Sequence, residues 1–216
     1  MKLKKYISRF HYLTQDRLDD FSVMEQVQMA CENGAKWIQL RIMPVEDTEW
    51  IRLANHAAAI CDDWGATLIL NDNVYVALAA ADVQGVHLGR GDMHPAEARR
   101  LLGDEKIIGG SALHLDDIRY FAENGADYIS IGPFKHTTTK ALSTEPIGIA
   151  GIEKLVESAQ AILGDLDIPL IVAGGVREED VEAILATGVH GVAVSSAINK
   201  AENPAAAYRS FYKKLL

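Results

Sequence analysis

Short apolar runs rich in β-branched residues alternate with longer amphipathic segments along nearly the whole chain. We expect the short runs to form buried strands and the longer segments to form helices with one apolar face. The expected strands are His11–Thr14, Trp37–Arg41, Thr67–Asn71, Gly85–Leu88, Lys106–Gly110, Tyr128–Gly132, Pro169–Ala173 and Gly191–Ser195. The expected helices include Val23–Glu32, Glu49–Asp63, Ala96–Leu102, Leu115–Asn124, Ile152–Ile162 and Glu179–Ala186.

Glycines follow several of these amphipathic segments, where a helix commonly ends in a left-handed residue. They are Gly34, Gly65, Gly103, Gly125 and Gly188. Strands that alternate with helices predict a parallel sheet with right-handed crossovers, and eight such strands are the number that closes a barrel. We therefore predict an α/β fold, a (β/α)8 TIM barrel. A doubly wound open sheet is the alternative, but no GxGxxG follows the first strand.

The composition fits one soluble globular domain spanning residues 1–216, with 49% hydrophobic and 24% charged residues. The net charge of −9 disfavours a nucleic-acid partner, although it does not exclude a phosphate pocket. No apolar stretch is long enough for a membrane span, and the basic N-terminus is not followed by the apolar run expected of a signal peptide. Cys31 and Cys61 are expected to be small buried residues in a reducing cytoplasm. The sequence leaves the oligomeric state open, a homo-oligomer included.

Polar and glycine residues gather at the ends of seven successive expected strands. In chain order they are Gln39 and Arg41, Asn71 and Asp72, His87 to Asp92, Gly110 and Ser111, Gly132 to Lys140, Gly174 and Gly175, and Ser195 and Ser196. Each pair alone is compatible with a turn, a helix cap or a surface salt bridge. Because the active site of a (β/α)8 barrel lies at the carboxyl ends of its strands, the whole set predicts one shared pocket.

The residue types in this set predict a pocket for phosphorylated ligands. Glycines after strand seven and serines after strand eight match the usual phosphate site of such barrels. The Thr137-Thr138-Thr139-Lys140 run adds hydroxyl donors and a cation for a second anionic group. Asp72 and Asp92, on adjacent strand ends, form a pair of carboxylates of the kind that holds Mg²⁺ together with substrate phosphates. Motifs for zinc hydrolases, nucleophilic serines and P-loops are absent from the sequence. His87 is expected to be structural, and the three tryptophans are expected to be packing residues.

These residues, taken in order, resemble the thiamine phosphate synthase family. The resemblance runs from the second strand to the eighth, and its most specific part is Thr-x-Thr-Lys after Gly132-Pro133. It implies an enzyme that joins a pyrimidine diphosphate to a thiazole phosphate with Mg²⁺ as cofactor. In this family the diphosphate leaves first and the thiazole nitrogen then attacks the resulting cation, so that no protein nucleophile is needed.

The resemblance also implies a role for each matching position. Gln39, Arg41 and Asn71 would line the pyrimidine diphosphate site, and Ser111 and Lys140 would bind the leaving group. Arg41, Ser111 and Lys140 are the implied catalytic residues. Asp72 and Asp92 would hold Mg²⁺ on the diphosphate. The thiazole phosphate would be held by Thr137, Thr138, Thr139, Gly175, Ser195 and Ser196.

The chain departs from the family pattern at two positions. The strand-two motif of the family continues to a lysine, and here that position is Met43. We expect Arg90 or Lys135 to compensate for the lost cation. The histidine of the family's Gly-x-Ser-x-His falls on Leu113, with His114 one residue late.

Three alternatives to the synthase stay open at this point. The thiazole tautomerases are a sister family in which that histidine serves in proton transfer, and Leu113 argues against membership. A paralogue that binds thiamine intermediates without catalysis would be consistent with Met43. Another phosphate-binding barrel, such as a sugar-phosphate epimerase, is disfavoured by the threonine run and the aspartate pair.

Overall fold

Eight parallel strands close into a barrel in the computed structural model, which describes residues 5–136, 145–164 and 167–216. Each strand pairs with its sequence neighbours, and β1 closes the ring by pairing with β8. The strands are β1 Phe10–Leu13, β2 Trp37–Leu40, β3 Thr67–Asn71, β4 Gly85–Leu88, β5 Ile107–Ala112, β6 Tyr128–Ile131, β7 Leu170–Ala173 and β8 Gly191–Val194. The predicted (β/α)8 barrel is confirmed.

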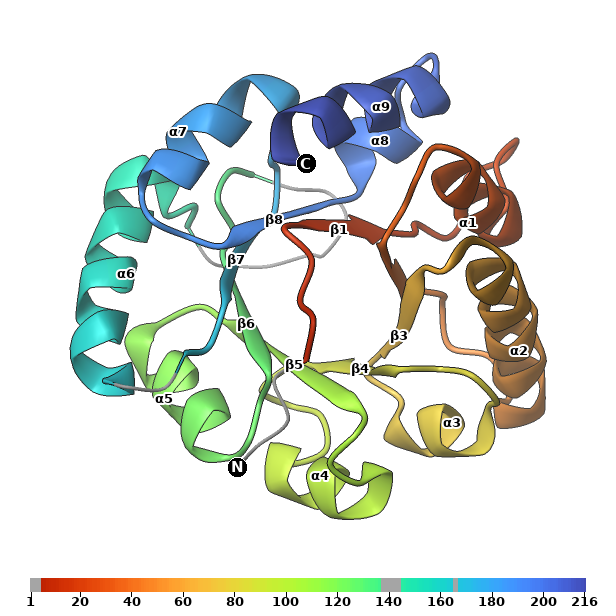
Figure 1. Cartoon of the computed structure of the whole chain (residues 1–216), viewed down its shortest axis with the longest axis horizontal. Coiled ribbons are helices and arrows are strands. Elements are labelled where there is room, and N and C mark those ends of the chain that lie inside the picture. Colours follow the sequence, from red (N-terminus) through yellow and green to blue (C-terminus); the bar gives the residue numbers. More distant parts are fainter. Residues whose placement is uncertain (1–4, 137–144, 165–166) are drawn as a thin grey trace.

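The helices lie outside this ring of strands, as Figure 1 shows. They are α1 Val23–Glu32, α2 Asp47–Trp64, α3 Val74–Ala79, α4 Pro95–Leu102, α5 Leu115–Glu123, α6 Gly148–Leu163, α7 Val181–Ala186, α8 Ser196–Asn199 and α9 Pro204–Leu215. The expected segment Glu179–Ala186 is divided into a 3-10 turn, Glu178–Asp180, and α7. The glycines expected after helices all have positive φ, so the predicted helix ends are confirmed.

Two layers of apolar residues hold the barrel together, one on each side of the strands. Between strands and helices lies the larger core, to which both buried cysteines belong. Inside the barrel a smaller cluster contains Ile7, Trp37, Ile69, Ile107, Tyr128, Ile171 and Ala193. Successive residues of a strand point to opposite faces, so the inward position recurs every second residue. This alternation decides which polar side chains reach the interior.

The segment before β1 covers the amino-terminal end of the barrel. Lys5 donates to Asp127 Oδ2 across 2.9 Å, and Ile7 joins the interior cluster. Arg9 Nε donates to the carbonyl oxygen of His190 at 3.1 Å. In Figure 1 this segment runs across the ring of strands before it enters β1. A ligand therefore has access from the opposite end, where the strands end.

The three tryptophans differ in their burial. Trp37 and Trp50 are packing residues as expected, but Trp64 at the end of α2 is 47% exposed, so that part of the prediction is wrong. Over the part of the chain that the structure describes, no helix has the length and apolar character to cross a membrane.

Candidate active site

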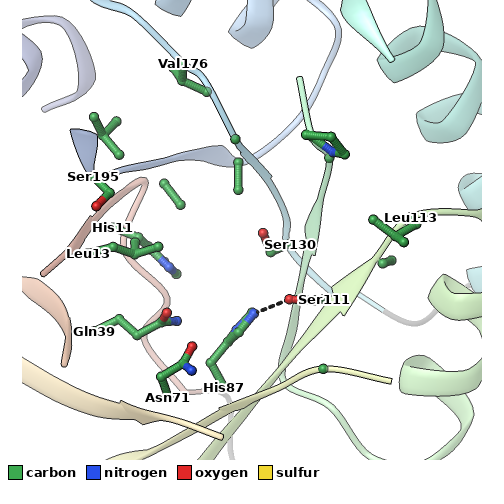
Figure 2. A pocket seen from close by; sticks show the side chains of 18 of the residues that line it. His11, Leu13, Gln39, Asn71, His87, Ser111, Leu113, Ser130, Val176 and Ser195 are labelled. Atoms are coloured by element: carbon green, nitrogen blue, oxygen red, sulfur yellow. Dashed lines mark hydrogen bonds between the residues drawn. The ribbon is translucent and has the colours of Figure 1, made fainter. Parts of the chain in front are cut away.

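A cavity of about 480 Å³ opens at the carboxyl ends of the strands. Every strand contributes to its wall, and Figure 2 shows several of these side chains converging on one space. One lining residue from each strand in turn is His11, Gln39, Asn71, His87, Ser111, Ser130, Ala173 and Ala193. The volume lies within the range of roughly 300–1,000 Å³ that is usual for small-molecule sites. The predicted shared pocket is present.

The two-residue period of the strands places polar groups directly above the interior core. On β2, Trp37 belongs to that core and Gln39 lines the cavity two residues later; Arg41, just beyond the strand, continues the same period. On β6, Tyr128 and Ser130 follow the same order. The inner wall of the cavity is therefore determined by strand register.

Arg41 lies just beyond β2 and is held through its backbone. Its N–H donates to Thr14 Oγ1 at 2.8 Å, and its carbonyl oxygen accepts from the same hydroxyl at 3.0 Å. Burial lowers the pKa of the guanidinium, and the negative charge of Asp72 opposes that effect. Because an arginine keeps its proton in proteins, the site has a fixed positive charge that is partly buried in the cavity wall.

Ser111 lies within β5, which extends two residues further than expected. Its hydroxyl oxygen lies 2.8 Å from His87 Nε2, and His87 Nδ1 lies 2.8 Å from the Tyr128 hydroxyl. Figure 2 shows the His87–Ser111 contact as a dashed line within the cavity. We expected His87 to be structural. It lies instead in the wall of the site, in direct contact with the predicted substrate-binding residue Ser111.

Asp72 and Asp92 line a second cavity of about 400 Å³. Asn71 lines both cavities and so joins them. Asn71 Nδ2 donates to Asp72 Oδ2 at 2.5 Å, and Asp92 Oδ2 accepts from the Gly89 N–H at 2.5 Å. The backbone of Asp72 has a positive φ of 66°, a left-handed conformation that aspartate and asparagine adopt more readily than most other non-glycine residues. The structure thus brings the two predicted metal ligands to one space beside the main cavity.

The donor set fits a hard cation whose remaining ligands come from substrate and water. Carboxylate oxygens suit Mg²⁺, which commonly takes one or two carboxylates and completes its shell with phosphates and water. Within the described residues no group of three or more His, Cys, Asp or Glu side chains is arranged to hold a metal ion by itself. Asp72 and Asp92 therefore fit a site that a phosphorylated substrate completes.

The ends of β7 and β8 form the other side of the cavity, since β3 and β4 lie across the barrel from them. Gly174, Gly175, Ser195 and Ser196 all line it. Gly175 has a φ of +73°, and a Cβ there would lie 2.8 Å from the Lys135 carbonyl oxygen. Only glycine fits this backbone without displacing its neighbours.

The remaining predicted residues are Thr137, Thr138, Thr139 and Lys140, which lie outside the described residues. Of the two cations expected to replace the family lysine, Arg90 lines the main cavity. It contacts Asp117 at 3.6 Å and lies 3.6 Å above the Tyr120 ring. Lys135 pairs with Asp180 at 2.6 Å and is not among the residues lining the main cavity. The geometry therefore favours Arg90 over Lys135.

Two buried polar residues at the site were not identified from the sequence. His11 lines the cavity, stacks on Trp37 with ring centroids 4.3 Å apart, and has no partner for its buried Nε2 among the described residues. Burial, and to a lesser extent the nearby His87, lowers the pKa of His11 well below its usual value. Asn199 donates to the Leu13 carbonyl oxygen at 2.9 Å and to Ser195 Oγ at 3.3 Å. The sequence placed His11 in the first expected strand, but the local pattern does not show which face of that strand turns inward.

Comparisons with known proteins agree with this geometry. The family model described as thiamine monophosphate synthase matches residues 10–198. A thiamine-phosphate synthase of Bacteroides fragilis is 41% identical over 86% of this chain and 90% of that protein. One from Flavobacterium psychrophilum is 34% identical over 96% of this chain and 99% of that protein.

A solved structure described as thiamine phosphate pyrophosphorylase from Pyrococcus furiosus superposes with a TM-score of 0.82. It is 30% identical, and the match covers 96% of this chain and 95% of that one. The family match, the relatives and the arrangement of the strand ends all indicate the same family. This chain belongs to the thiamine monophosphate synthase family.

Proposed function

We propose that this chain is a transferase that joins hydroxymethylpyrimidine diphosphate to a thiazole phosphate, giving thiamine phosphate and pyrophosphate. The observation that carries the proposal is one cavity with two different polar walls. Arg41, Asn71 and Ser111 line one wall, and Gly175 and Ser195 line the wall across the barrel. Two anionic substrates bound on these walls would meet between them.

The wall formed by β2 to β5 would take the pyrimidine diphosphate. Arg41 supplies a permanent charge to the leaving group, and Ser111 supplies a hydroxyl. Lys140 is proposed to add a second cation there. Arg90, at the rim, would replace part of the charge that the family lysine provides at the position of Met43.

Asp72 and Asp92 would hold Mg²⁺ against the diphosphate from the adjoining cavity. When bound, this ion would neutralise charge that develops on the departing diphosphate. The support for this assignment is that both carboxylates line one space, which Asn71 joins to the main cavity.

The wall formed by β7 and β8 would take the thiazole phosphate. Gly175 brings backbone close to the cavity without a side chain, and Ser195 and Ser196 present hydroxyl and amide groups at the start of α8. Thr137, Thr138 and Thr139 are proposed to contribute hydroxyl donors. Such a site holds a phosphate through hydrogen bonds, without a requirement for a broad positive surface.

The reaction proposed for this site breaks the bond between the pyrimidine methylene carbon and the diphosphate oxygen. The bonding electrons leave with the diphosphate, and the thiazole nitrogen then forms a bond to the methylene carbon. Arg41 and the hydroxyl of Ser111 stabilise the leaving group, and the two walls hold the reactants in line. No proton has to be removed from the thiazole nitrogen, so a general base is not required.

The phosphorylated substrates and the two buried thiols are consistent with our proposal of a cytoplasmic enzyme. The alternative of a tautomerase finds less support, because Leu113 and His114 both line the cavity but the family histidine position is occupied by the aliphatic residue.

The experiment that tests the proposal is pyrophosphate release from both substrates with Mg²⁺, with thiamine phosphate identified as the product. Arg41→Gln, Ser111→Ala and Lys140→Ala should each lower turnover by about tenfold or more. Arg52→Gln is the matched control, because Arg52 pairs with Glu49 on the exposed face of α2. A folded protein that binds both substrates and releases no pyrophosphate would contradict the proposal and favour the non-catalytic paralogue.

A further inference from the structure

Three side chains from three strands form a chain of hydrogen bonds in the wall of the main cavity. His87 on β4 is at its centre, with Ser111 Oγ 2.8 Å from Nε2 and the Tyr128 hydroxyl 2.8 Å from Nδ1. His87 and Tyr128 are buried, which shields their contact from bulk solvent.

The direction of this chain follows from the chemistry of Tyr128. Burial raises the pKa of its phenol far above the usual value, so the hydroxyl keeps its proton. A phenol O–H is a stronger donor than the N–H of a neutral imidazole, and an unprotonated imidazole nitrogen is a stronger acceptor than a phenol oxygen, so Tyr128 donates in its 2.8 Å contact with His87. The single phenol proton is then available to His87 Nδ1.

A histidine that accepts at Nδ1 carries its proton on Nε2 when it is neutral. Nε2–H then donates to Ser111 Oγ, so the Ser111 hydroxyl does not need to donate to His87. The Ser111 hydroxyl proton is then available to another acceptor. Because Ser111 lines the cavity in which we place the diphosphate, that acceptor would be a diphosphate oxygen.

We propose that Tyr128 and His87 form a one-way chain of hydrogen bonds that fixes the Nε2–H tautomer of His87 and thereby turns the Ser111 hydroxyl proton toward the bound diphosphate. His87 and Tyr128 are positioning residues in this scheme, because they act through Ser111. The identity of the anion rests on the proposed function, whereas the assignment of the His87 tautomer is independent of it.

The opposite direction would impair binding of an anion. If Nδ1 carried the proton, Nε2 would accept from Ser111, and the serine would present only oxygen lone pairs to the ligand. A preorganised donor stabilises developing negative charge without reorientation, and this is the usual source of such stabilisation in enzyme sites. The buried chain therefore gives the hydroxyl a defined polarity before the substrate arrives.

The direct test is nitrogen-15 NMR of histidine-labelled protein without ligand, with the His87 signals assigned by their loss in His87→Gln. We expect one protonated nitrogen, Nε2, and one unprotonated nitrogen, Nδ1. In Tyr128→Phe both shifts should move toward a mixture of tautomers. In Tyr208→Phe, which removes another buried tyrosine hydroxyl outside the barrel interior, they should stay unchanged. An Nδ1–H tautomer in the unmodified protein would overturn the proposal, and so would unchanged shifts in Tyr128→Phe.

A second measurement connects the tautomer to the ligand, with inorganic pyrophosphate and Mg²⁺ as the probe. Tyr128→Phe should weaken pyrophosphate binding by about fivefold, the scale of one ordinary hydrogen bond. In a Ser111→Ala background the same substitution should have no further effect, because the positioned hydroxyl is gone. Equal losses in both backgrounds would show a general structural role and contradict the proposal. If the unmodified protein shows the Nε2–H tautomer but releases no pyrophosphate with both substrates, the proposed function fails and the tautomer assignment stands.

Discussion

Gly109 on β5 leaves room for the Tyr128 ring on β6, and no larger residue fits between the two strands. A Cβ built on Gly109 would lie 2.2 Å from Cζ of Tyr128 and 2.4 Å from its hydroxyl oxygen. Tyr128 is part of the interior core and also of the hydrogen-bond chain to Ser111. The space left by one glycine therefore determines where a functional hydroxyl lies.

Gly109→Ala should accordingly destabilise the protein and impair the site. Overpacking of this kind costs about 1–3 kcal/mol of unfolding free energy, and the displaced Tyr128 should lower the affinity for pyrophosphate. Chemical denaturation and pyrophosphate binding measure the two effects. Gly91→Ala is the control for stability, since a Cβ there has open space around it. An unchanged denaturation midpoint in Gly109→Ala would contradict the expected clash.

A buried ion pair network at the amino-terminal end of the barrel should control the acid stability of the fold. Asp127 Oδ2 accepts from Lys5 at 2.9 Å, from Arg99 at 2.5 Å and from the Ile108 N–H at 2.8 Å. Burial by itself raises the pKa of Asp127, but the hydrogen bonds from Ile108 and Lys5 and the charge of Arg99 outweigh it, so the pKa is lowered.

Because the folded-state pKa is lower than the unfolded value, ionised Asp127 stabilises the fold above the usual carboxyl pKa of 3.8. This contribution disappears as the pH falls through the folded-state value. Asp127→Asn should lose about 3–5 kcal/mol near neutral pH, since Lys5 and Arg99 would keep their charges without the partner. Denaturation at several pH values should show the difference from the unmodified protein shrinking below about pH 4. A loss of stability that does not depend on pH would show that the charge of Asp127 is not the cause.

Arg90 should carry part of the affinity for the pyrimidine diphosphate. It lines the cavity and is held by Asp117 and Tyr120, whereas Met43 is 40% exposed and is not among the residues lining the cavity. Arg90→Gln should raise the KM for the pyrimidine diphosphate by about tenfold, with little change in the KM for the thiazole phosphate.

Lys135→Gln is the matched control for Arg90, because Lys135 pairs with Asp180 and is not among the residues lining the main cavity. Introducing Met43→Lys into the Arg90→Gln variant should restore part of the lost affinity. Equal kinetic constants for Arg90→Gln and the unmodified protein would exclude Arg90 as the replacement for the family lysine.

Asp92 should determine how much Mg²⁺ the reaction requires. It lines the same cavity as Asp72, and a magnesium site with few protein ligands depends strongly on each of them. Asp92→Asn should raise the Mg²⁺ concentration for half-maximal pyrophosphate release by about tenfold or more, the effect of losing a charged ligand.

Asp104→Asn is the control for the change in net charge, because Asp104 is an exposed carboxylate in the loop between α4 and β5. If Asp92→Asn and the unmodified protein have the same Mg²⁺ dependence, the metal assignment to Asp92 is wrong.

The sequence by itself determined the order of strands and helices, because each element carries a local signal. Thr67–Asn71, Gly85–Leu88 and Val23–Glu32 were expected with the bounds that the structure has. It also placed Arg41, Asn71 and Ser111 near one another, since parallel strands of a barrel end on the same side.

Only the tertiary structure decided the roles of His87, Tyr128 and His11. Each lies within a strand, where the local pattern shows alternation but not which face turns toward the barrel axis. Closure of the barrel fixes that choice, because β1 pairs with β8 and every strand then has one inner and one outer face. The contacts of His87 with Ser111 and Tyr128 join residues 24 and 41 positions apart in the chain, and no local spacing encodes such pairs. The division between the two cavities arises in the same way, since Asp72 and Asp92 come together only when β3 and β4 are side by side.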